Sequence, residues 1–421
     1  MLDGKPFLFG VISSPTLAET QSVDLDFYLS EMSVSDGHGG GLTMQRVLSA
    51  ELERIAFFAH VHPFAEQCPP TESVKARCLD LSMWLDTAAA RRRLGHRVAG
   101  HLAQRTFFHR LHANAAAAKI FAALPEKSRP ARGLVCPQGL ASLYVIERLR
   151  HIQRVQYITW IMDDHLVRWR DGRWCYPAGA EELFARHLKR ARLVFVISPV
   201  MADFYRERFG INARVLFGAC DLAPMSSLAL HHQAGELRLA YFGAVGDWQL
   251  DALAVVAQNM AAAGATLDIY NSLPELPDVL RSGSVRLKGR IAPEKILETM
   301  QCYDAVVLPA SFRPALRHMT ELNIATKMSE CLASGTVTLA VGPTYAAMIR
   351  FLQKRGAGLC VTDPSPAALA TAFARLRDNK ERARLIEAAR ELVEQELCTK
   401  AMRNEWLRGV AVFNSMKQMP L

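Results

Sequence analysis

Three polar residues in the second half of the chain lie at helical spacing. Thr326, Lys327 and Glu330 share one face of a predicted helix that ends before Gly335, because residues three and four apart are neighbours on a helix. A buried strand is predicted directly after it, over residues 337–341. Ligands of open α/β sheets bind outside the carboxyl ends of strands, near helix N-termini, so we expect Thr326 and Lys327 to meet an anionic ligand. An exposed ion pair between Lys327 and Glu330 is the alternative interpretation.

Three consecutive glycines, Gly39, Gly40 and Gly41, stand between a strand predicted over residues 27–34 and a helix predicted over residues 42–52. Glycine lets backbone N–H groups come close to a ligand at the start of a helix, which favours a ligand-facing loop. The spacing matches neither G-x-G-x-x-G nor a P-loop. A flexible turn without a ligand is the other interpretation.

Asp163, Asp164 and His165 follow a strand predicted over residues 156–162. Polar residues at the carboxyl end of a strand occupy the place where α/β sheets carry out chemistry. The carboxylates could position or deprotonate a hydroxyl group, and His165 could do the same near neutral pH. A helix cap and turn would use the same residues without catalysis.

The elements that must position these residues alternate between strand and helix. The alternation breaks over residues 223–235, which are typical of an interdomain linker, and restarts with a strand over residues 237–242 that ends at Gly243. A further strand, over residues 285–288, leads to Gly289 and Arg290. The pattern predicts an α/β protein with two Rossmann-like domains facing across a cleft.

Composition limits the functional classes. A chain of 421 residues favours two domains, and its formal net charge of +9 attracts anionic ligands or surfaces, although charge alone cannot choose between a membrane and nucleic acid. The scattered cysteines and the weak N-terminal apolar run favour a cytoplasmic location. Residues 71–125 are rich in arginine on an amphipathic pattern, so either peripheral contact with the inner face of a membrane or a solvated helix face is expected.

The order of these motifs resembles the GT-B glycosyltransferases of the large retaining family 4. The resemblance spans most of the chain and is carried by Gly39–Met44, Trp160–His165 with Val196–Ser198, Tyr241–Gly243, Lys288-Gly289, Asp304–Pro309, Thr326–Glu330, Leu332–Gly335 and Gly342-Pro343. It implies that the second half binds a nucleotide-sugar and that Glu330 holds the donor ribose. It also implies that the final helix, with Trp406, Val410 and Phe413, returns to the first domain.

The chain departs from the family pattern at three places. The family often has two acids separated by seven residues; Glu330 is the second, but Leu322 stands at the first position and Glu321 misses it by one. The basic residues that commonly clamp the donor phosphates are missing from residues 243–251, where Arg290, Arg317 or Lys327 are the candidate replacements. The family's histidine before the acidic pair is Met162 here, with His165 close by.

We therefore expect a hexosyltransferase of polysaccharide biosynthesis that moves a sugar from a nucleoside diphosphate sugar to a glycan or lipid-linked acceptor. The first domain would span residues 1–222 with residues 400–421, and the second residues 236–399. No cofactor and no nucleic acid partner is expected. No metal ion is expected either, because glycine amides and basic side chains would stabilise the leaving diphosphate in its place. The expected site comprises Asp163, Asp164 and His165 for catalysis, and for the donor Gly39, Gly40, Gly41, Gly243, Gly289, Arg290, Thr326, Lys327 and Glu330. A degenerate binding or assembly subunit and a nucleotide-sugar epimerase are the alternatives.

Overall fold

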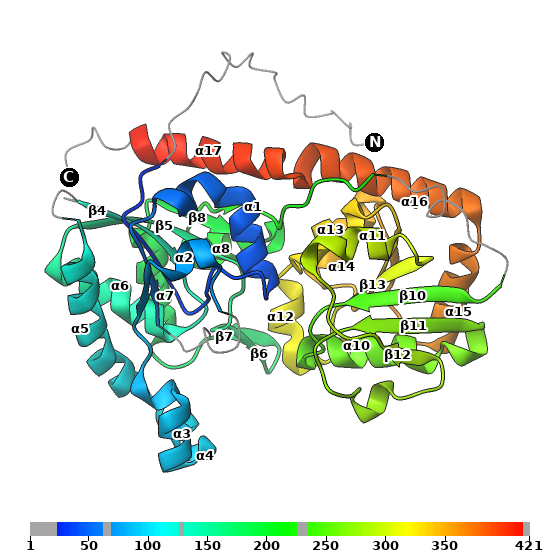
Figure 1. Ribbon diagram of the computed structural model, residues 1–421, viewed down its shortest axis with the longest axis horizontal. Coiled ribbons are helices and arrows are strands. Elements are labelled where there is room, and N and C mark those ends of the chain that lie inside the picture. The colour runs from blue at the N-terminus through cyan, green and yellow to red at the C-terminus, as the bar shows by residue number, and fades with distance from the viewer. Residues whose placement is uncertain (1–22, 62–68, 104, 126–129, 225–234, 416–421) are drawn as a thin grey trace, which may run out of the picture.

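Two parallel sheets, each covered by helices, lie side by side, and a long helical segment at the C-terminal end runs along both (Figure 1). The computed structural model describes residues 23–61, 69–103, 105–125, 130–224 and 235–415. The described residues contain no helix that is long and apolar enough to cross a membrane.

The first sheet has seven strands in the order β3-β2-β1-β4-β5-β8-β9. Its neighbouring strands are all parallel, and the chain changes its direction of progress across the sheet between β1 and β4. The strands are β1 (Phe27–Ser30), β2 (Phe57–His60), β3 (Cys78–Asp80), β4 (Ala131–Cys136), β5 (Val155–Ile161), β8 (Leu193–Val196) and β9 (Arg214–Val215). A separate antiparallel hairpin joins β6 (Arg168–Arg170) to β7 (Arg173–Cys175).

The second sheet has six strands in the order β12-β11-β10-β13-β14-β15, again all parallel. Its change of direction lies between β10 and β13 and so repeats the first sheet's arrangement. The strands are β10 (Leu237–Phe242), β11 (Ala265–Tyr270), β12 (Val285–Leu287), β13 (Ala305–Pro309), β14 (Val337–Val341) and β15 (Leu359–Val361).

Helices cover the two sheets, as parallel strands require for their crossover connections. Those of the N-terminal half are α1 (Gly39–Arg54), α2 (Glu72–Lys75), α3 (Ala88–Leu94), α4 (His96–Ala103), α5 (Thr106–Ala123), α6 (Leu140–Ile152), α7 (Ala180–Arg190) and α8 (Pro199–Phe209). Those that follow are α10 (Asp247–Gln258), α11 (Ile296–Met300), α12 (Arg317–Glu321), α13 (Lys327–Ala333), α14 (Ala347–Arg355), α15 (Pro366–Leu376), α16 (Asn379–Leu392) and α17 (Thr399–Ser415).

Local sequence explains where these elements begin and end, and α8 is an example. The Ser198 hydroxyl accepts a hydrogen bond from the Met201 amide at 3.0 Å, and Pro199 occupies the first helical turn, where its missing N–H costs nothing. Gly210 then ends the helix with φ of 68°, a left-handed conformation that glycine adopts without strain. The central strands β1, β13 and β14 are buried along their whole length, as expected for parallel strands covered on both faces.

The last helix, α17, packs on the N-terminal half although it follows the second sheet. Trp406 is fully buried, stacks on Phe195 of β8 with 5.3 Å between ring centroids, and donates a hydrogen bond to Glu51 of α1 at 3.2 Å. Arg132 of β4 lies over the ring of Phe413 at 5.8 Å. The predicted fold, two Rossmann-like parts with a returning C-terminal helix, is therefore confirmed.

One predicted segment differs from the structure, and another lies mostly outside the residues that the structure describes. The glycines at 39–41 were expected to form a loop before a helix, but α1 begins at Gly39, so they form its first turn. The helix starts early because the His38 ring caps it by accepting from the Gly41 amide at 3.0 Å. Of the predicted linker, residues 225–234 lie outside the described residues, so the boundaries at 222 and 236 remain a prediction.

The Glu51 carboxylate, which is fully buried, is the centre of the contact between α1 and α17. It accepts hydrogen bonds from both Arg403 guanidinium nitrogens, the one to Nη2 measuring 2.9 Å, in addition to the one from Trp406. Removing one partner of a buried ion pair leaves an uncompensated charge, so we expect Arg403→Ala to lower the free energy of unfolding by about 3–5 kcal/mol. Arg408→Ala, at an exposed pair on the same helix, should cost less than about 1 kcal/mol. Equal urea denaturation midpoints for the two variants would contradict this.

Candidate active site

A cavity of about 1070 Å³ lies between the two sheets. Segments that follow β1 and β4 of the first sheet line it, including Gly39 and Gly40 and, after β4, Gln138. Segments that follow β10 and β13 of the second sheet line it as well, among them Trp248 and Ala310. The cavity therefore joins the places where the strand order of each sheet changes direction, which is where open α/β sheets bind ligands.

The N-terminus of α1 forms one wall. The His38 Nε2 atom lies 2.8 Å from the Ser33 carbonyl, so that nitrogen must carry the proton, and Nδ1 is left to accept from the Gly41 amide. Burial lowers the pKa of His38 and thus favours this neutral form. The amides of Gly39 and Gly40 have no partner within the helix and lie at the cavity wall, an arrangement that suits an anion.

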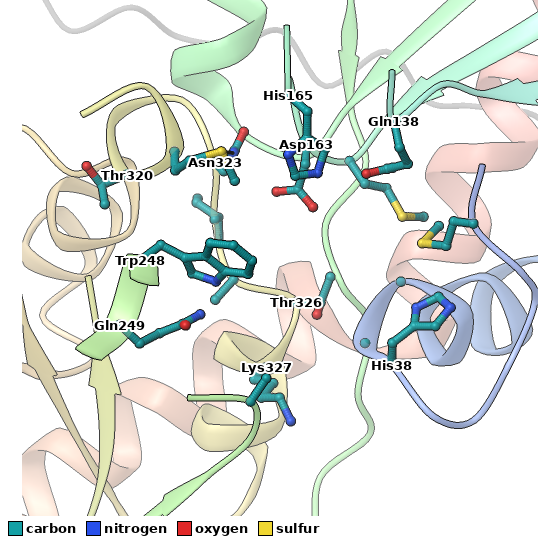
Figure 2. Close-up of a pocket in the computed structure, with 18 of the residues that line it drawn as sticks. His38, Gln138, Asp163, His165, Trp248, Gln249, Thr320, Asn323, Thr326 and Lys327 are labelled. Atoms are coloured by element: carbon teal, nitrogen blue, oxygen red, sulfur yellow. Dashed lines mark hydrogen bonds between the residues drawn. The ribbon is translucent and has the colours of Figure 1, made fainter. Parts of the chain in front are cut away.

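Asp163 and His165 lie between the two walls of the cavity in Figure 2, directly after β5. Burial raises the pKa of the Asp163 carboxyl, the neighbouring His165 lowers it, and Asp164 raises it again. Burial lowers the pKa of His318, from the second half, to about 4, and the nearby charges of Arg168 and His165 add to this effect. A carboxyl group beside an imidazole can position a hydroxyl and exchange a proton with it.

Asp164, the other predicted carboxylate, is buried away from the cavity. It accepts hydrogen bonds from the Leu166 and Val167 amides, both at 3.0 Å, and from the hydroxyls of Tyr176 at 2.9 Å and Tyr205 at 3.0 Å. These bonds hold the turn after β5 against α8 and so position its neighbours Asp163 and His165.

Lys327 and Thr326 line the cavity from the second half, at the start of α13. The Lys327 side chain passes over Gly243, where an added Cβ would lie 2.8 Å from Lys327 Cε and 3.1 Å from its Nζ. Gly243 also has φ of 145°. A larger residue at this position is therefore excluded both by the Lys327 side chain and by the backbone conformation. A Cβ on Gly39 would lie 2.0 Å from Thr326 Oγ1, so α1 and α13 approach each other only because position 39 is glycine.

Glu330 lies behind this wall and not in it. Its carboxylate Oε1 is 2.9 Å from Nη2 of Arg46 on α1, and Nη1 of the same arginine donates to the Ala219 carbonyl at 2.9 Å. The side chain of Glu330 is only 8% exposed, so this pair is mostly shielded from water. Leu322, at the position of the family's first acid, is buried in the core. Glu321 instead forms an ion pair with Arg317.

The remaining predicted donor residues lie outside the cavity lining. Gly41 is enclosed by the backbone of Ser35, where an added Cβ would be 2.1 Å from its carbonyl oxygen. Gly289 and Arg290 follow β12, and Arg290 is exposed. Arg317, a candidate phosphate clamp, is held between the rings of Trp169 at 3.9 Å and Tyr345 at 4.6 Å. Of the candidate basic residues, Lys327 alone lines the cavity among the residues described.

Sequence reasoning missed several polar and aromatic side chains of the site. Trp248 and Gln249 form the wall opposite His38 and Gln138, and Thr320 and Asn323 lie on the same side as Trp248 (Figure 2). Trp248 is 44% exposed although it is large and aromatic. The available signal was its position, since it follows the first strand of the second sheet and opens α10. An exposed tryptophan there offers a flat apolar surface to a sugar or a base.

The fold and this cavity define a GT-B protein, two Rossmann-like parts with a site between them. Sucrose-phosphate synthase from Thermosynechococcus elongatus is similar, with a TM-score of 0.66 at 16% identity over 93% of this chain and 100% of that one. HepE from Anabaena, in complex with UDP-glucose, has a TM-score of 0.60 at 13% identity over 92% of this chain and 99% of that one. TarM of S. aureus has a TM-score of 0.53 at 14% identity over 71% of this chain and 58% of that one. No protein-family model and no curated protein matches the sequence.

The two adjacent carboxylates should respond oppositely to amide substitution. The pKa of Asp163 is raised in the folded state, so the folded protein binds more protons than the unfolded chain between the ordinary aspartate pKa and the raised one. Stability is therefore lost as pH rises through that window, and Asp163→Asn should be more stable than the parent near pH 7.

That advantage should disappear below about pH 4, where aspartate is protonated in both states. Asp164→Asn removes charge-assisted hydrogen bonds in the core and should be less stable by about 1–3 kcal/mol near neutral pH. Urea unfolding of both variants between pH 3.5 and pH 7.5 measures this, and loss of stability in Asp163→Asn at pH 7 would refute the assignment.

Proposed function

We propose that this protein transfers a hexosyl group from a nucleoside diphosphate sugar to a hydroxyl of a glycan or lipid-linked acceptor. The observation that supports it best is a cavity at the direction changes of both sheets, where the N-terminus of α1 and the Lys327 ammonium group meet. Backbone amides and a cation on opposite sides of one space suit a diphosphate. The GT-B fold is an analogy of architecture and does not by itself identify a reaction.

A uridine nucleotide is the first donor to test. HepE, of similar fold, has been crystallised with UDP, with UDP and glucose, and with UDP-glucose. In this chain the amides of Gly39 and Gly40 and the side chains of Thr326 and Lys327 would receive the diphosphate, with Gly243 giving Lys327 its path. Trp248 and Gln249 would face the sugar or the base.

Retention of the anomeric configuration and independence of metal are further parts of the proposal. The anomeric carbon–oxygen bond of the donor would break toward the diphosphate while the acceptor oxygen bonds to the same face of the sugar. Asp163 and His165 would orient the acceptor hydroxyl, and its proton would pass to them or to the leaving diphosphate. Gly289, Arg290 and Glu330 would contribute to the donor site only after the second half moves relative to the first.

A non-catalytic GT-B subunit is the second candidate function. Leu322 is buried at the position of the first family acid, and the second acid, Glu330, is already paired with Arg46. A protein that had lost turnover could keep both features, since they stabilise the contact between the halves.

A titration with UDP distinguishes these functions and tests the role of Lys327. We expect UDP to bind, and Lys327→Ala to weaken binding by roughly 10- to 150-fold, because a hydrogen bond to a charged group contributes about 1.5–3 kcal/mol. Lys354→Ala, on the exposed last turn of α14, is the matched control and should bind as the parent does. If calorimetry detects no binding of uridine, adenosine or guanosine diphosphate, the non-catalytic subunit would be favoured.

Chelation tests metal independence. Within the described residues, no group of three or more His, Cys, Asp or Glu side chains is placed to hold a metal ion. We expect UDP-glucose turnover to be unchanged after dialysis against EDTA, because Lys327 and the α1 amides would stabilise the leaving group in place of a metal. The control is the same preparation dialysed against Ca²⁺-free buffer without EDTA, which should keep its turnover. A loss of turnover after EDTA that Mg²⁺ or Mn²⁺ restores would overturn this part of the proposal.

A further inference from the structure

A helical arm, residues 83–123, contains α3, α4 and α5. Its outer helices α3 and α4 project away from both sheets (Figure 1), whereas α5 packs on the N-terminal half, where its Ala113 and Ile120 belong to the core that contains Phe27 of β1. The outer part of the arm has a small core of its own, in which Met83 and Leu85 pack with Leu102 and Phe108. Its base is α5, which packs on α6 through the stacked rings of His109 and Tyr144, 5.9 Å apart.

The arm is strongly basic, and Asp86 near its start is its one acidic residue. From Thr87 to Pro125 the sequence contains no acidic residue. The same stretch carries seven basic side chains, Arg91, Arg92, Arg93, Arg97, Arg105, Arg110 and Lys119. A run of this length without a compensating carboxylate produces a positive field that attracts a polyanionic surface.

The arm also exposes more apolar surface than its own packing requires. Of the ten large hydrophobic side chains that are exposed in the described parts of the chain, six lie on it: Trp84, Leu94, Val98, Phe107, Leu111 and Phe121. Phe107 is 67% and Leu111 59% exposed, and they are four residues apart on α5, so they form one patch. Exposed apolar side chains gathered in one place mark an interaction surface.

The arm reaches the candidate active site. Arg91 of α3 and His109 of α5 line the cavity between the two sheets. A surface that bound the arm would therefore lie beside the mouth of that cavity. Neither the charge nor the apolar patch is used by the donor residues proposed above.

We propose that the helical arm docks on an anionic phospholipid bilayer. Leu94, Val98, Phe107 and Leu111 would enter the boundary between headgroups and acyl chains, and the arginines would contact lipid phosphates, as in interfacial amphipathic helices. Exposed phenylalanine, leucine and valine beside arginine favour a lipid surface over nucleic acid, whose backbone would use the cations and leave the apolar side chains in water. In one respect the inference rests on the proposed function, since the cavity mouth would then face a lipid-linked acceptor.

Vesicle co-sedimentation of the full chain tests the docking. The parent should bind vesicles that contain 30 mol% phosphatidylglycerol in phosphatidylcholine, and bind vesicles of pure phosphatidylcholine at least tenfold more weakly. Arg92→Gln with Arg93→Gln should lower the partition coefficient by roughly 10- to 30-fold, at about fivefold for each cation removed near the surface. Phe107→Ser with Leu111→Ser should lower it by at least tenfold, since both side chains lose contact with the bilayer interior.

The matched control is Val279→Ser with Arg350→Gln, which changes one exposed apolar and one exposed basic residue on the second half. It should bind as the parent does, and circular dichroism should show that all variants are folded. Absence of binding to both kinds of vesicle, or arm variants that bind like the parent, would overturn the docking. So would a 20-nucleotide RNA that displaces the protein from vesicles at equal phosphate concentration.

A UDP titration on the same preparations separates this inference from the proposed function. A preparation that binds UDP but not vesicles would refute the docking alone. One that binds vesicles but no nucleotide diphosphate would leave the docking intact and refute the donor assignment.

Discussion

The buried carboxylate of Glu51 is the contact on which the arrangement of this protein depends. It belongs to α1, and its partners Arg403 and Trp406 belong to α17, the last helix. Because α1 begins at the cavity with Gly39 and Gly40, the C-terminal helix fixes the element whose amides form the cavity wall. A charge buried at this depth is tolerated only with such partners, so α17 cannot leave without destabilising the N-terminal half. The chain thus crosses between its halves twice and is held at both crossings, since the Cys220 amide bonds the Leu397 carbonyl at 3.0 Å.

Away from α17, the two halves also contact each other behind and beside the cavity wall. The Ser198 and Ser329 hydroxyls donate to the carbonyls of Leu322 and Gly218, and Arg46 pairs with Glu330. Each neutral hydrogen bond contributes about 0.5–1.5 kcal/mol, whereas burying the Trp406 ring alone contributes several times that through its area of about 150–250 Å². The neutral bonds are thus the weaker contacts. A ligand that needs more space between α1 and α13 must also disturb the shielded pair of Arg46 with Glu330.

The sequence was sufficient for the architecture and for part of the site. Alternating strands and helices, each with its own buried stripe, predict two Rossmann-like parts. The three apolar residues of the last helix predict that it is covered, and the resemblance to the GT-B glycosyltransferases implied that the first domain covers it. The predicted residues Asp163, His165, Thr326 and Lys327 line the cavity, because they directly follow strands or open a helix. Trp248 was missed because a lone tryptophan near a helix start is usually core, and its exposure is a tertiary property. Asp164 could not be separated from Asp163, since alternate side chains after a strand point opposite ways and only the fold shows which one meets Tyr176 and Tyr205.

Glu330 shows why a local pattern does not determine a role. The family resemblance implied a ribose contact for Glu330, and its spacing from Lys327 allowed a local ion pair. Its partner is Arg46, which no local pattern brings near it. A neutral ribose hydroxyl that displaced Arg46 would leave a shielded carboxylate without a counter-charge, which costs several kcal/mol. Arg46 contacts Oε1 of the carboxylate, and a carboxylate has lone pairs on both oxygens, so a ribose could add at Oε2 while Arg46 stays. Since Glu330 lies behind the cavity wall, that addition requires α13 to shift relative to α1. Lys327 needs no such shift, because it already lines the cavity, so under the proposed function a diphosphate would contact Lys327 before a ribose reached Glu330.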